Sequence, residues 1–311
     1  MSAKHLLSIT NLGLEQISRL VDRALVFAND PPGGAKPLAG KTVGLYFRGT
    51  STRTRTAFTV AAQRLGADTI AYGPSDLQLV TGETIEDTAR VLSGFLDALV
   101  IRTNQTMAEM ESFARQDGMA VINAMSENEH PTQAIADLVT LKEALGRLEG
   151  VHVLYLGEGN NSAASLALAV SLTPGMRLTL MTPEGYGLPQ REMQTARRLA
   201  EQNGSVIEQH HDLGKLPKGV DAVYTTRWQT MGVPKAEANW RAKFEPYGVT
   251  ARLMARVSKP DGTIFLHDLP AVRGADVDDE VLDGPQSVAF RQAKHKLTSA
   301  MAVLEWCAGQ A

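Results

Sequence analysis

The sequence predicts an α/β protein built from two doubly wound parallel-sheet domains. Its 311 residues exceed the size at which a single hydrophobic core stops growing, roughly 250 to 300 residues, so two domains are expected. Short apolar segments rich in β-branched residues alternate with helical patterns, and this βαβ order is typical of a parallel sheet covered by helices on both faces. The alternation runs in two series, one for each domain.

The first series predicts strands in the N-terminal half. Its strand segments are KTVGLYF at 41–47, TIAYG at 69–73, ALVIRT at 98–103 and MAVINA at 119–124. Helices are expected from Thr54 to Leu65, near Thr84 to Phe95, and again before the last of these strands. The second series supplies VHVLYLGE at 151–158, RLTLMTP at 177–183, AVYTTRW at 222–228 and TIFLHDL at 263–269, with helices between them.

Helical segments are expected to join the two domains. The segment 130–147, HPTQAIADLVTLKEALGR, has apolar residues at helical spacing and lies between the two series. We therefore expect a first domain over residues 1–147 and a second over residues 148–287. A C-terminal helix at 288–311 is expected to pack back on the first domain.

Charge and composition point to a small-molecule ligand. The 34 acidic and 31 basic residues nearly balance, so the chain lacks the broad positive field that would hold a nucleic acid or an anionic membrane. The N-terminus has no apolar signal core, and no stretch approaches the ~20 apolar residues of a membrane span. The single cysteine, Cys307, cannot form an internal disulfide or a structural zinc site. We therefore expect a soluble cytoplasmic protein with Cys307 packed in the last helix.

Polar residues follow the first predicted strand and lead into a helix. The segment is Arg48-Gly49-Thr50-Ser51-Thr52-Arg53-Thr54-Arg55. Ser51 or Thr52 can cap the helix, whose free N–H groups and positive dipole end favour an anion. Because ligands of open α/β sheets bind at the carboxyl ends of strands, the segment is a candidate phosphate cradle. The alternative is a basic, well-capped helix start; a Walker loop is excluded because the Gly-Lys-Ser/Thr ending is absent.

Two more strand ends in the same half carry polar side chains. Arg102 ends its strand and offers a second guanidinium for the same anion, although a lone arginine in this position is more often an ordinary surface residue. His130 and Gln133 stand about one helical turn apart and can address the same ligand oxygen, although a lone His-Pro pair commonly marks only a turn. Polar residues at several strand ends of one domain favour a shared ligand site.

Two signatures resemble the carbamoyl-phosphate site of the aspartate and ornithine transcarbamylase family: STRTR at 51–55 and HPTQ at 130–133. The similarity extends through nearly the whole chain. Segments 75–93, 157–166 and 259–290 look particularly like ornithine transcarbamylase. The resemblance implies the transcarbamylase fold, with a carbamoyl-phosphate-binding domain followed by an amino-acceptor-binding domain. It also implies transfer of a carbamoyl group from carbamoyl phosphate to a primary amine, with no metal or organic cofactor.

The resemblance assigns roles in the first site. The residues that would hold the phosphate are Ser51, Thr52, Arg53 and Thr54, with Arg102 bridging phosphate and carbamoyl oxygens. His130 would hydrogen-bond the carbonyl oxygen, and Gln133 the carbamoyl nitrogen. The family's final phosphate contact is an arginine; Lys296 stands there and keeps the charge but loses the bidentate fork. The family works as a homotrimer in which a neighbour's loop, containing Gln78 here, closes each site.

The implied chemistry is direct. A neutral amine attacks the carbamoyl carbon, negative charge grows on the carbonyl oxygen, and phosphate leaves. The catalytic residues are then Arg53, Thr54, Arg102, His130 and Gln133, as donors placed where that charge develops. The leaving phosphate can accept the amine proton, so no protein general base is assigned.

The acceptor site departs from the ornithine pattern. The family's aspartate after Val-Tyr-Thr is Thr226 here, whereas the cysteine before the closing loop is Asp268. Arg227 and Gln229 resemble residues with which aspartate transcarbamylase binds acceptor carboxylates, yet Asn161 is of the ornithine type. The full acceptor set is Asn161, Thr226, Arg227, Gln229, Thr230, Met231, Asp268 and Leu269.

This hybrid pattern has two interpretations. In the first interpretation, Asp268 binds an ammonium group and Arg227 binds a carboxylate, which favours a non-ornithine amino acid or diamino acid as acceptor. The alternative is sequence drift around an ordinary ornithine carbamoyltransferase that makes citrulline, with Asp268 capping a turn and Arg227 solvated.

Two other classes of function compete with carbamoyl transfer. The strand that runs into Gly157-Glu158-Gly159 suggests dinucleotide binding, but the third glycine of that fingerprint is missing. The second competing class is a non-catalytic relative that only binds carbamoyl phosphate. The complete set from Ser51 to Arg55 together with His130 argues against it, because a sensor has no need of groups that polarise a carbonyl.

Overall fold

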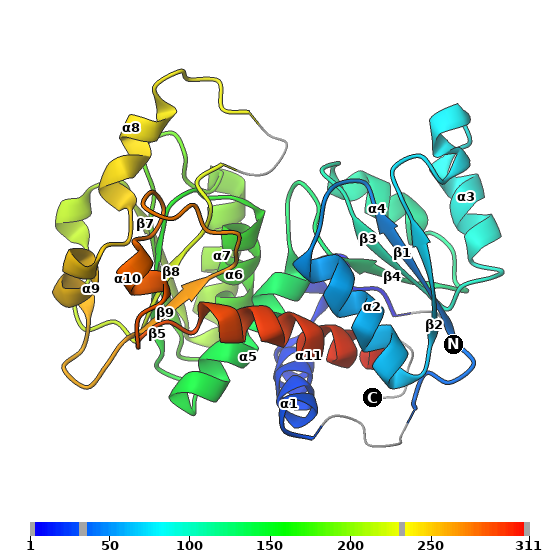
Figure 1. Cartoon of the computed structure of the whole chain (residues 1–311), viewed down its shortest axis with the longest axis horizontal. Helices are drawn as coiled ribbons and strands as arrows, with labels where there is room; N and C mark the ends of the chain where they lie inside the picture. The colour runs from blue at the N-terminus through cyan, green and yellow to red at the C-terminus, as the bar shows by residue number, and fades with distance from the viewer. Residues whose placement is uncertain (1–3, 31–35, 230–233, 308–311) are drawn as a thin grey trace. The chain divides into compact units, whose positions relative to one another are not determined.

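The computed structural model (Figure 1) describes residues 4–30, 36–229 and 234–307. The chain forms two compact units, one made of Met1–Val139 with Lys294–Ala311 and the other of Thr140–Ala293. We call them unit 1 and unit 2. Helices α5 (Pro131–Leu145) and α11 (Ala289–Cys307) each contain one of the points at which the chain passes between the units. Each unit is built on a parallel sheet, which confirms the predicted fold class.

The sheet of unit 1 has the strand order β2-β1-β3-β4. Its strands are β1 (Thr42–Phe47), β2 (Asp68–Tyr72), β3 (Ala98–Arg102) and β4 (Ala120–Asn123). From β1 the chain continues to the β2 side of the sheet, whereas from β3 it continues to the β4 side. The carboxyl ends of β1 and β3 therefore form a topological switch point, where ligands of doubly wound sheets bind. Phe47 pairs with Arg102 at that end.

Helices of unit 1 follow the predicted positions and add short elements. They are η1 (Ile9–Asn11), α1 (Leu14–Asn29), α2 (Arg53–Leu65), η2 (Gln78–Thr81), α3 (Ile85–Leu92) and α4 (Met107–Phe113). Helix α3 starts where the Thr84 hydroxyl accepts the Asp87 N–H at 3.1 Å, and α2 ends at Gly66, whose φ of +91° suits glycine. A buried cluster around Tyr46, Leu99 and Phe113 packs α3 and α4 against the sheet.

Unit 2 repeats the plan with the order β7-β6-β5-β8-β9. Its strands are β5 (His152–Leu156), β6 (Arg177–Met181), β7 (Val206–His210), β8 (Ala222–Thr225) and β9 (Ile264–His267). The switch point lies between β5 and β8. Strand β7 was not predicted from the sequence, because it is an edge strand in which only Ile207 is buried and polar residues dominate.

The helices of unit 2 include one that is buried along its whole length, α6 (Asn161–Ser171). The others are α7 (Gln190–Asn203), η3 (Leu213–Lys215), α8 (Trp240–Phe244), η4 (Glu245–Tyr247), α9 (Ala251–Val257) and α10 (Asp279–Leu282). Asn160 caps α6 by accepting the N–H groups of Ser162 and Ala163 at 3.0 and 3.1 Å. This cap fixes the turn that leads from β5 into α6 at the switch point.

The structure also bears on the predictions about Cys307 and about membrane-spanning segments. Cys307 is a free, buried thiol at the end of α11, as expected, and burial raises its pKa. Among the helices of the described residues, none combines the length and the apolar composition needed to cross a bilayer.

Candidate functional site

Cationic and polar side chains meet at the switch point of unit 1. Arg102, the last residue of β3, is buried, and its Nη1 donates to the hydroxyl of buried Thr54 at 3.4 Å. Thr54 lies in the first turn of α2, the helix that follows β1 after the segment 48–52. The predicted meeting of the two strand ends is therefore present in the structure.

The start of α2 differs from the sequence expectation in its cap. Thr52 occupies the N-cap position, but its backbone is already helical (φ −72°, ψ −60°) and its side chain makes no capping bond. The expected capping by Thr52 is wrong, because a capping hydroxyl requires an extended backbone at that position. A helix cannot satisfy the N–H groups of its own first turn, and without a side-chain cap this turn suits an external anion. Ser51 and Arg53 flank Thr52 and are each half-buried.

His130 lies buried in the same unit, directly before α5. Its pKa is lowered well below the ordinary value, first because burial desolvates the charged form and then because Lys296 and Arg102 repel it. The imidazole is therefore neutral near neutral pH. One ring nitrogen, Nδ1, lies 3.4 Å from the Thr132 hydroxyl. A neutral imidazole can donate one hydrogen bond to a carbonyl oxygen without carrying charge of its own.

Gln133 and Lys296 are bound to each other, which sequence reasoning missed. Lys296 is buried in α11, and its ammonium group donates to the side-chain oxygen of Gln133. The Gln133 side-chain nitrogen donates to Asp137 at 2.7 Å. Both ends of the amide are thus occupied, so a bond from Gln133 oxygen to a carbamoyl nitrogen has to displace or share Lys296. The contact between Gln133 and Asp137 could have been predicted from the sequence, because Asp137 follows Gln133 by four residues and the two therefore lie on the same face of one helix.

Neighbouring charges have structural partners. Arg48 donates from Nη1 to Glu109 at 2.7 Å, and Glu109 also accepts the hydroxyl of Thr103 at 3.2 Å. Glu129, just before His130, accepts the Ser8 hydroxyl at 2.6 Å and the Ile9 N–H at 3.1 Å. Arg48 and Glu129 therefore brace the loops around the site.

Gln78, expected to serve a neighbouring subunit, lies exposed at the start of η2. Its contacts are local: the Thr81 hydroxyl donates to its backbone oxygen at 2.8 Å and to its side-chain oxygen at 2.7 Å. The element ends at Gly82 in the left-handed conformation, with φ +102°. The role of Gln78 stays a prediction.

A second group of polar residues gathers at the switch point of unit 2. The Thr226 hydroxyl, just after β8, donates to both carboxylate oxygens of Asp268 at 3.0 and 3.1 Å. Asn160, which caps α6, points its side-chain nitrogen at the same hydroxyl at 3.4 Å. Asn161 is the buried first residue of α6. The structure thus joins the position that lost the family's carboxylate to the position that gained one.

The turn after β9 holds Asp268 in place. Leu269 has φ +54°, an uncommon value for a side chain with a Cβ, and its N–H donates to Nδ1 of His267 at 2.8 Å. The His267 ring is fully buried, and its Nε2 lies 3.7 Å from the carboxylate of Asp276. Non-glycine residues in such conformations cost about 1 to 3 kcal/mol and cluster at functional sites. This turn therefore places Asp268, which remains only 14% exposed in its side chain.

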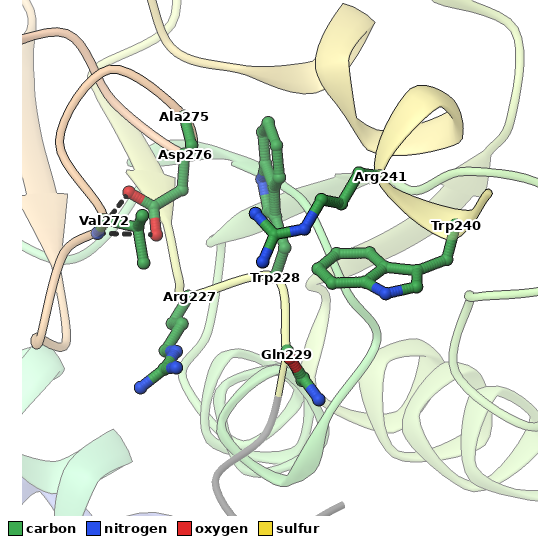
Figure 2. A pocket seen from close by; sticks show the side chains of 8 residues that line it. All are labelled: Arg227, Trp228, Gln229, Trp240, Arg241, Val272, Ala275 and Asp276. Atoms are coloured by element: carbon green, nitrogen blue, oxygen red, sulfur yellow. Dashed lines mark hydrogen bonds between the residues drawn. The ribbon is translucent and has the colours of Figure 1, made fainter. Parts of the chain in front are cut away.

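Arg227 and Gln229 line a small pocket of unit 2 (Figure 2). Its other lining residues are Trp228, Trp240, Arg241, Val272, Ala275 and Asp276. Sequence reasoning missed Trp240 and Arg241 because they follow no predicted strand; they lie in the short helix α8. Thr230 and Met231, also expected at the acceptor site, lie outside the described residues.

The Gly157-Glu158-Gly159 turn is explained by packing. A Cβ at Gly159 would lie 2.3 Å from the backbone nitrogen of Leu188, so only glycine fits against that loop. Glu158 forms an ion pair with Lys235. The second glycine therefore faces backbone, which disfavours the dinucleotide hypothesis for this turn. In the described part of the chain, no group of three or more His, Cys, Asp or Glu side chains could hold a metal ion.

Family models match both halves of the chain. Residues 4–143 match the aspartate/ornithine carbamoyltransferase carbamoyl-P binding domain, and residues 149–307 match the aspartate/ornithine carbamoyltransferase Asp/Orn binding domain.

Individual relatives agree with the family models. The chain is 39% identical over 310 residues to an ornithine carbamoyltransferase of Caldicellulosiruptor saccharolyticus, with 99% of each chain covered. It is 41% identical over 269 residues to one of Methanobrevibacter smithii, covering 86% of this chain and 88% of that one. The solved structure of ornithine carbamoyltransferase from Pyrococcus furiosus superposes with a TM-score of 0.92 at 38% identity, covering 100% of this chain and 98% of the other.

Proposed function

This chain is an enzyme that belongs to the aspartate/ornithine carbamoyltransferase family, and from that membership we propose that it carbamoylates the amine of an amino acid, using carbamoyl phosphate and releasing phosphate. One observation carries the proposal. Thr54, Arg102, His130 and Lys296 come from separate elements and meet, buried, beside an uncapped helix start. A buried cluster that includes two cations and several hydrogen-bond donors suits an anionic ligand.

In the proposed reaction the residues of unit 1 act as fixed donors. The α2 start, Arg53 and Arg102 bind the phosphate, and Thr54 and neutral His130 donate toward the carbonyl oxygen as negative charge develops there. Lys296 adds charge, and Gln133 fixes its ammonium group. Each donor is in place before the reaction, which lowers the reorganisation required in the transition state.

For the acceptor we propose L-ornithine. The support is that relatives covering nearly the whole chain at 36 to 39% identity are named ornithine carbamoyltransferases. These comparisons favour ornithine over the non-ornithine acceptor expected from the hybrid motif.

A second acceptor class has a specific observation in its favour. Thr226 carries no formal charge, and its hydroxyl is committed to Asp268. If Asp268 binds the acceptor's ammonium group in place of the family's aspartate, the selecting charge stands at a different strand end, which favours an acceptor of a different chain length. A diamino acid shorter or longer than ornithine is the corresponding substrate.

One experiment separates these proposals. Phosphate release from carbamoyl phosphate is measured with ornithine, its shorter and longer diamino-acid homologues, aspartate and putrescine. The highest kcat/KM with ornithine supports the first acceptor, and the highest with a homologue supports the second. No release with any amine contradicts the proposed function.

We also propose that the enzyme is a homotrimer. Edge strand β2 and the elements next to it expose large apolar side chains, of which Phe95 is 72% exposed. The others are Ile70, Val80 and Val91. Exposed apolar surface beside Gln78 suits a subunit contact that delivers Gln78 to a neighbour. Light scattering should give three times the 33.5 kDa chain mass, and Phe95→Asp should lower it; a fully active monomer contradicts the proposal.

A further inference from the structure

A lysine of unit 2 carries a buried ammonium group. Lys235 lies between β8 and α8, and its side chain is only 5% exposed. The ammonium group forms an ion pair with Glu158, whose side chain is 19% exposed. Lysine side chains are almost never buried to this extent unless they are paired, because removing an ammonium group from water is costly. The position of Lys235 therefore calls for an explanation.

Three aromatic rings lie within reach of the same ammonium group. Its nitrogen is 4.7 Å from the ring centre of Tyr186, 4.9 Å from that of Phe244 and 5.4 Å from that of Trp240. A cation within about 6 Å of a ring centre is attracted by the negative face of the ring. We call these three rings the aromatic cage. Lys235 occupies the cage, and Trp240 also lines the pocket of Figure 2.

The cage is a packed unit rather than a set of separate rings. The ring centre of Phe244 lies 4.9 Å from that of Tyr186 and 5.6 Å from that of Trp240, both in edge-on contact. Phe244 is fully buried. Edge-to-face packing of this kind stabilises aromatic pairs beyond the burial of their area. The ion pair of Lys235 therefore forms against a wall whose members hold one another in place.

Glu158 attaches the cage to the switch point of unit 2. It belongs to the turn between β5 and α6. The N–H of the next residue, Gly159, donates to the backbone oxygen of Tyr186 at 2.8 Å, so the same turn also holds one ring of the cage. Asn160 then caps α6, and its side-chain nitrogen lies 3.4 Å from the hydroxyl of the first residue after β8. The carboxylate that binds Lys235 is therefore part of the turn that faces the candidate acceptor site.

The cage reaches the candidate acceptor residues through Trp228. The Trp228 ring lies 5.7 Å from that of Phe244, between ring centres. On the side of the β5–α6 turn, a Cβ added at Gly157 would lie 3.6 Å from the indole, so the indole packs against this turn as well. Trp228 stands between Arg227 and Gln229 in the sequence. Its placement therefore also sets the backbone from which these two side chains extend.

We propose that Lys235 is a positioning residue for the acceptor. Its ion pair with Glu158, inside the aromatic cage, holds α8 against the β5–α6 turn and so fixes Trp228 and the two candidate acceptor residues beside it. This role rests on the proposed function and adds a residue that acts through Trp228 and not on the substrate. Binding residues are effective only where packing and hydrogen bonds lock their positions. Loss of the ion pair should therefore weaken acceptor binding more than it slows the chemical step.

The test removes the ion pair from either side and then from both. Lys235→Met keeps most of the side-chain volume without the charge, Glu158→Gln keeps an acceptor oxygen, and the double variant lacks both charges. KM and kcat are measured by phosphate release, with carbamoyl phosphate and with ornithine, or the diamino-acid homologue of higher kcat/KM, varied in turn. Lys243→Met on α8 is the matched control. Lys243 also forms an ion pair, with Glu237 at 2.6 Å, but these two side chains are 41% and 46% exposed.

We expect each single variant to raise KM for the acceptor roughly 5- to 50-fold and to change KM for carbamoyl phosphate by less than about 2-fold. The double variant should show no more than the larger single effect, because the two charges act as a pair. Effects that multiply, or an equal effect of the Lys243→Met control, overturn the ion pair as the positioning device. Thermal unfolding is followed in parallel. A lower unfolding temperature with an unchanged acceptor KM makes Lys235 a purely structural residue and also overturns the proposal.

A binding measurement separates this role from the transfer reaction. If the wild type releases no phosphate with any amine, the proposed function fails, and ornithine binding is then measured by calorimetry in the presence of carbamoyl phosphate. Weaker binding to Lys235→Met, with the Lys243→Met control unchanged, supports the positioning role. Equal binding to both variants, or no binding to the wild type, overturns it. If Lys235→Met does not fold, Glu158→Gln, which leaves the lysine in its cage, carries the same comparison.

Discussion

The two candidate sites hold their cations in opposite ways. In unit 1, Arg102 and Lys296 are buried and braced by Thr54 and Gln133. In unit 2, Arg227 and Arg241 lie at the surface of a pocket, without such partners among the described residues. The first arrangement fixes its cations by hydrogen bonds within the protein, whereas the second shows no such bonds among the described residues. Fixed donors suit the chemical step, which depends on preorganised electrostatics, whereas open ones suit the choice of substrate.

This difference predicts the order in which the two substrates bind. Arg102 and Lys296 both lower the pKa of His130, so these groups repel an additional proton while the anion site is empty. Carbamoyl phosphate relieves that repulsion and should therefore bind first, ahead of the amine. Calorimetry with ornithine alone should give weak binding that strengthens when carbamoyl phosphate is added. Equal affinity in both titrations would remove the basis for this order.

The largest expected effect is at the braced site. Arg53→Ala should lower kcat/KM for carbamoyl phosphate by about 1000-fold or more, because it removes a charged donor from both the bound and the reacting phosphate. Steady-state phosphate release measures it. Arg64→Ala, in the last turn of the same helix, is the matched control and should leave kcat/KM unchanged. Equal, small effects of the two substitutions would argue against a phosphate site at the α2 start.

His130→Ala should act mainly on kcat, lowering it roughly 100- to 1000-fold, because the bond from His130 strengthens as the oxyanion forms. KM for carbamoyl phosphate should change much less. A large rise in KM with unchanged kcat would instead identify His130 as a ground-state contact.

The depressed pKa of His130 also predicts a pH effect on stability. The folded pKa is below the ordinary value of 6.5, so the unfolded chain binds this proton more readily. The contribution of neutral His130 is fully present above pH 6.5 and is lost as the pH falls toward the folded pKa. Thermal unfolding of the wild type should therefore lose more stability between pH 7 and 5 than that of His130→Ala. Parallel curves would contradict a buried, neutral His130.

Substitutions in unit 2 are expected to have smaller effects, and these effects should appear in KM for the amino-acid acceptor. Asp268→Asn should raise KM for the amino-acid acceptor roughly 10- to 100-fold, the equivalent of a charge-assisted bond of about 1.5 to 3 kcal/mol. Thr226→Val removes only the neutral hydroxyl that holds Asp268 and should have a weaker effect. KM for carbamoyl phosphate should stay constant in both. If neither variant changes the acceptor KM, the pairing of Thr226 with Asp268 is structural.

The contrast between the sites also explains what the sequence could predict. Strand ends such as Arg102 and the segment into α2 were predictable, because parallel strands bring their carboxyl ends to one edge. The Gln133–Lys296 pair was not, because its members are far apart in sequence and meet only through tertiary packing. Arg241 and Trp240 were missed for a different reason, because their helix, α8, does not directly follow a predicted strand. Edge strand β7 was hidden by its polar residues.

The smallest effect comes from restoring the family's arginine. Lys296 is buried and donates to Gln133, and as a point charge it cannot form the two parallel bonds that a guanidinium gives a phosphate. Lys296→Arg should lower KM for carbamoyl phosphate by roughly 2- to 5-fold, less than a full charge-assisted bond, because one cation merely replaces another. The longer side chain also overpacks a buried position, and such changes cost about 1 to 3 kcal/mol of stability. Phosphate-release kinetics and thermal unfolding measure the two effects. Lys294→Arg, exposed on the same helix, should change neither. If Lys296→Arg instead raises KM as strongly as Lys296→Met, then the ammonium group serves to position Gln133, and the phosphate contact belongs to Arg53 and Arg102 alone.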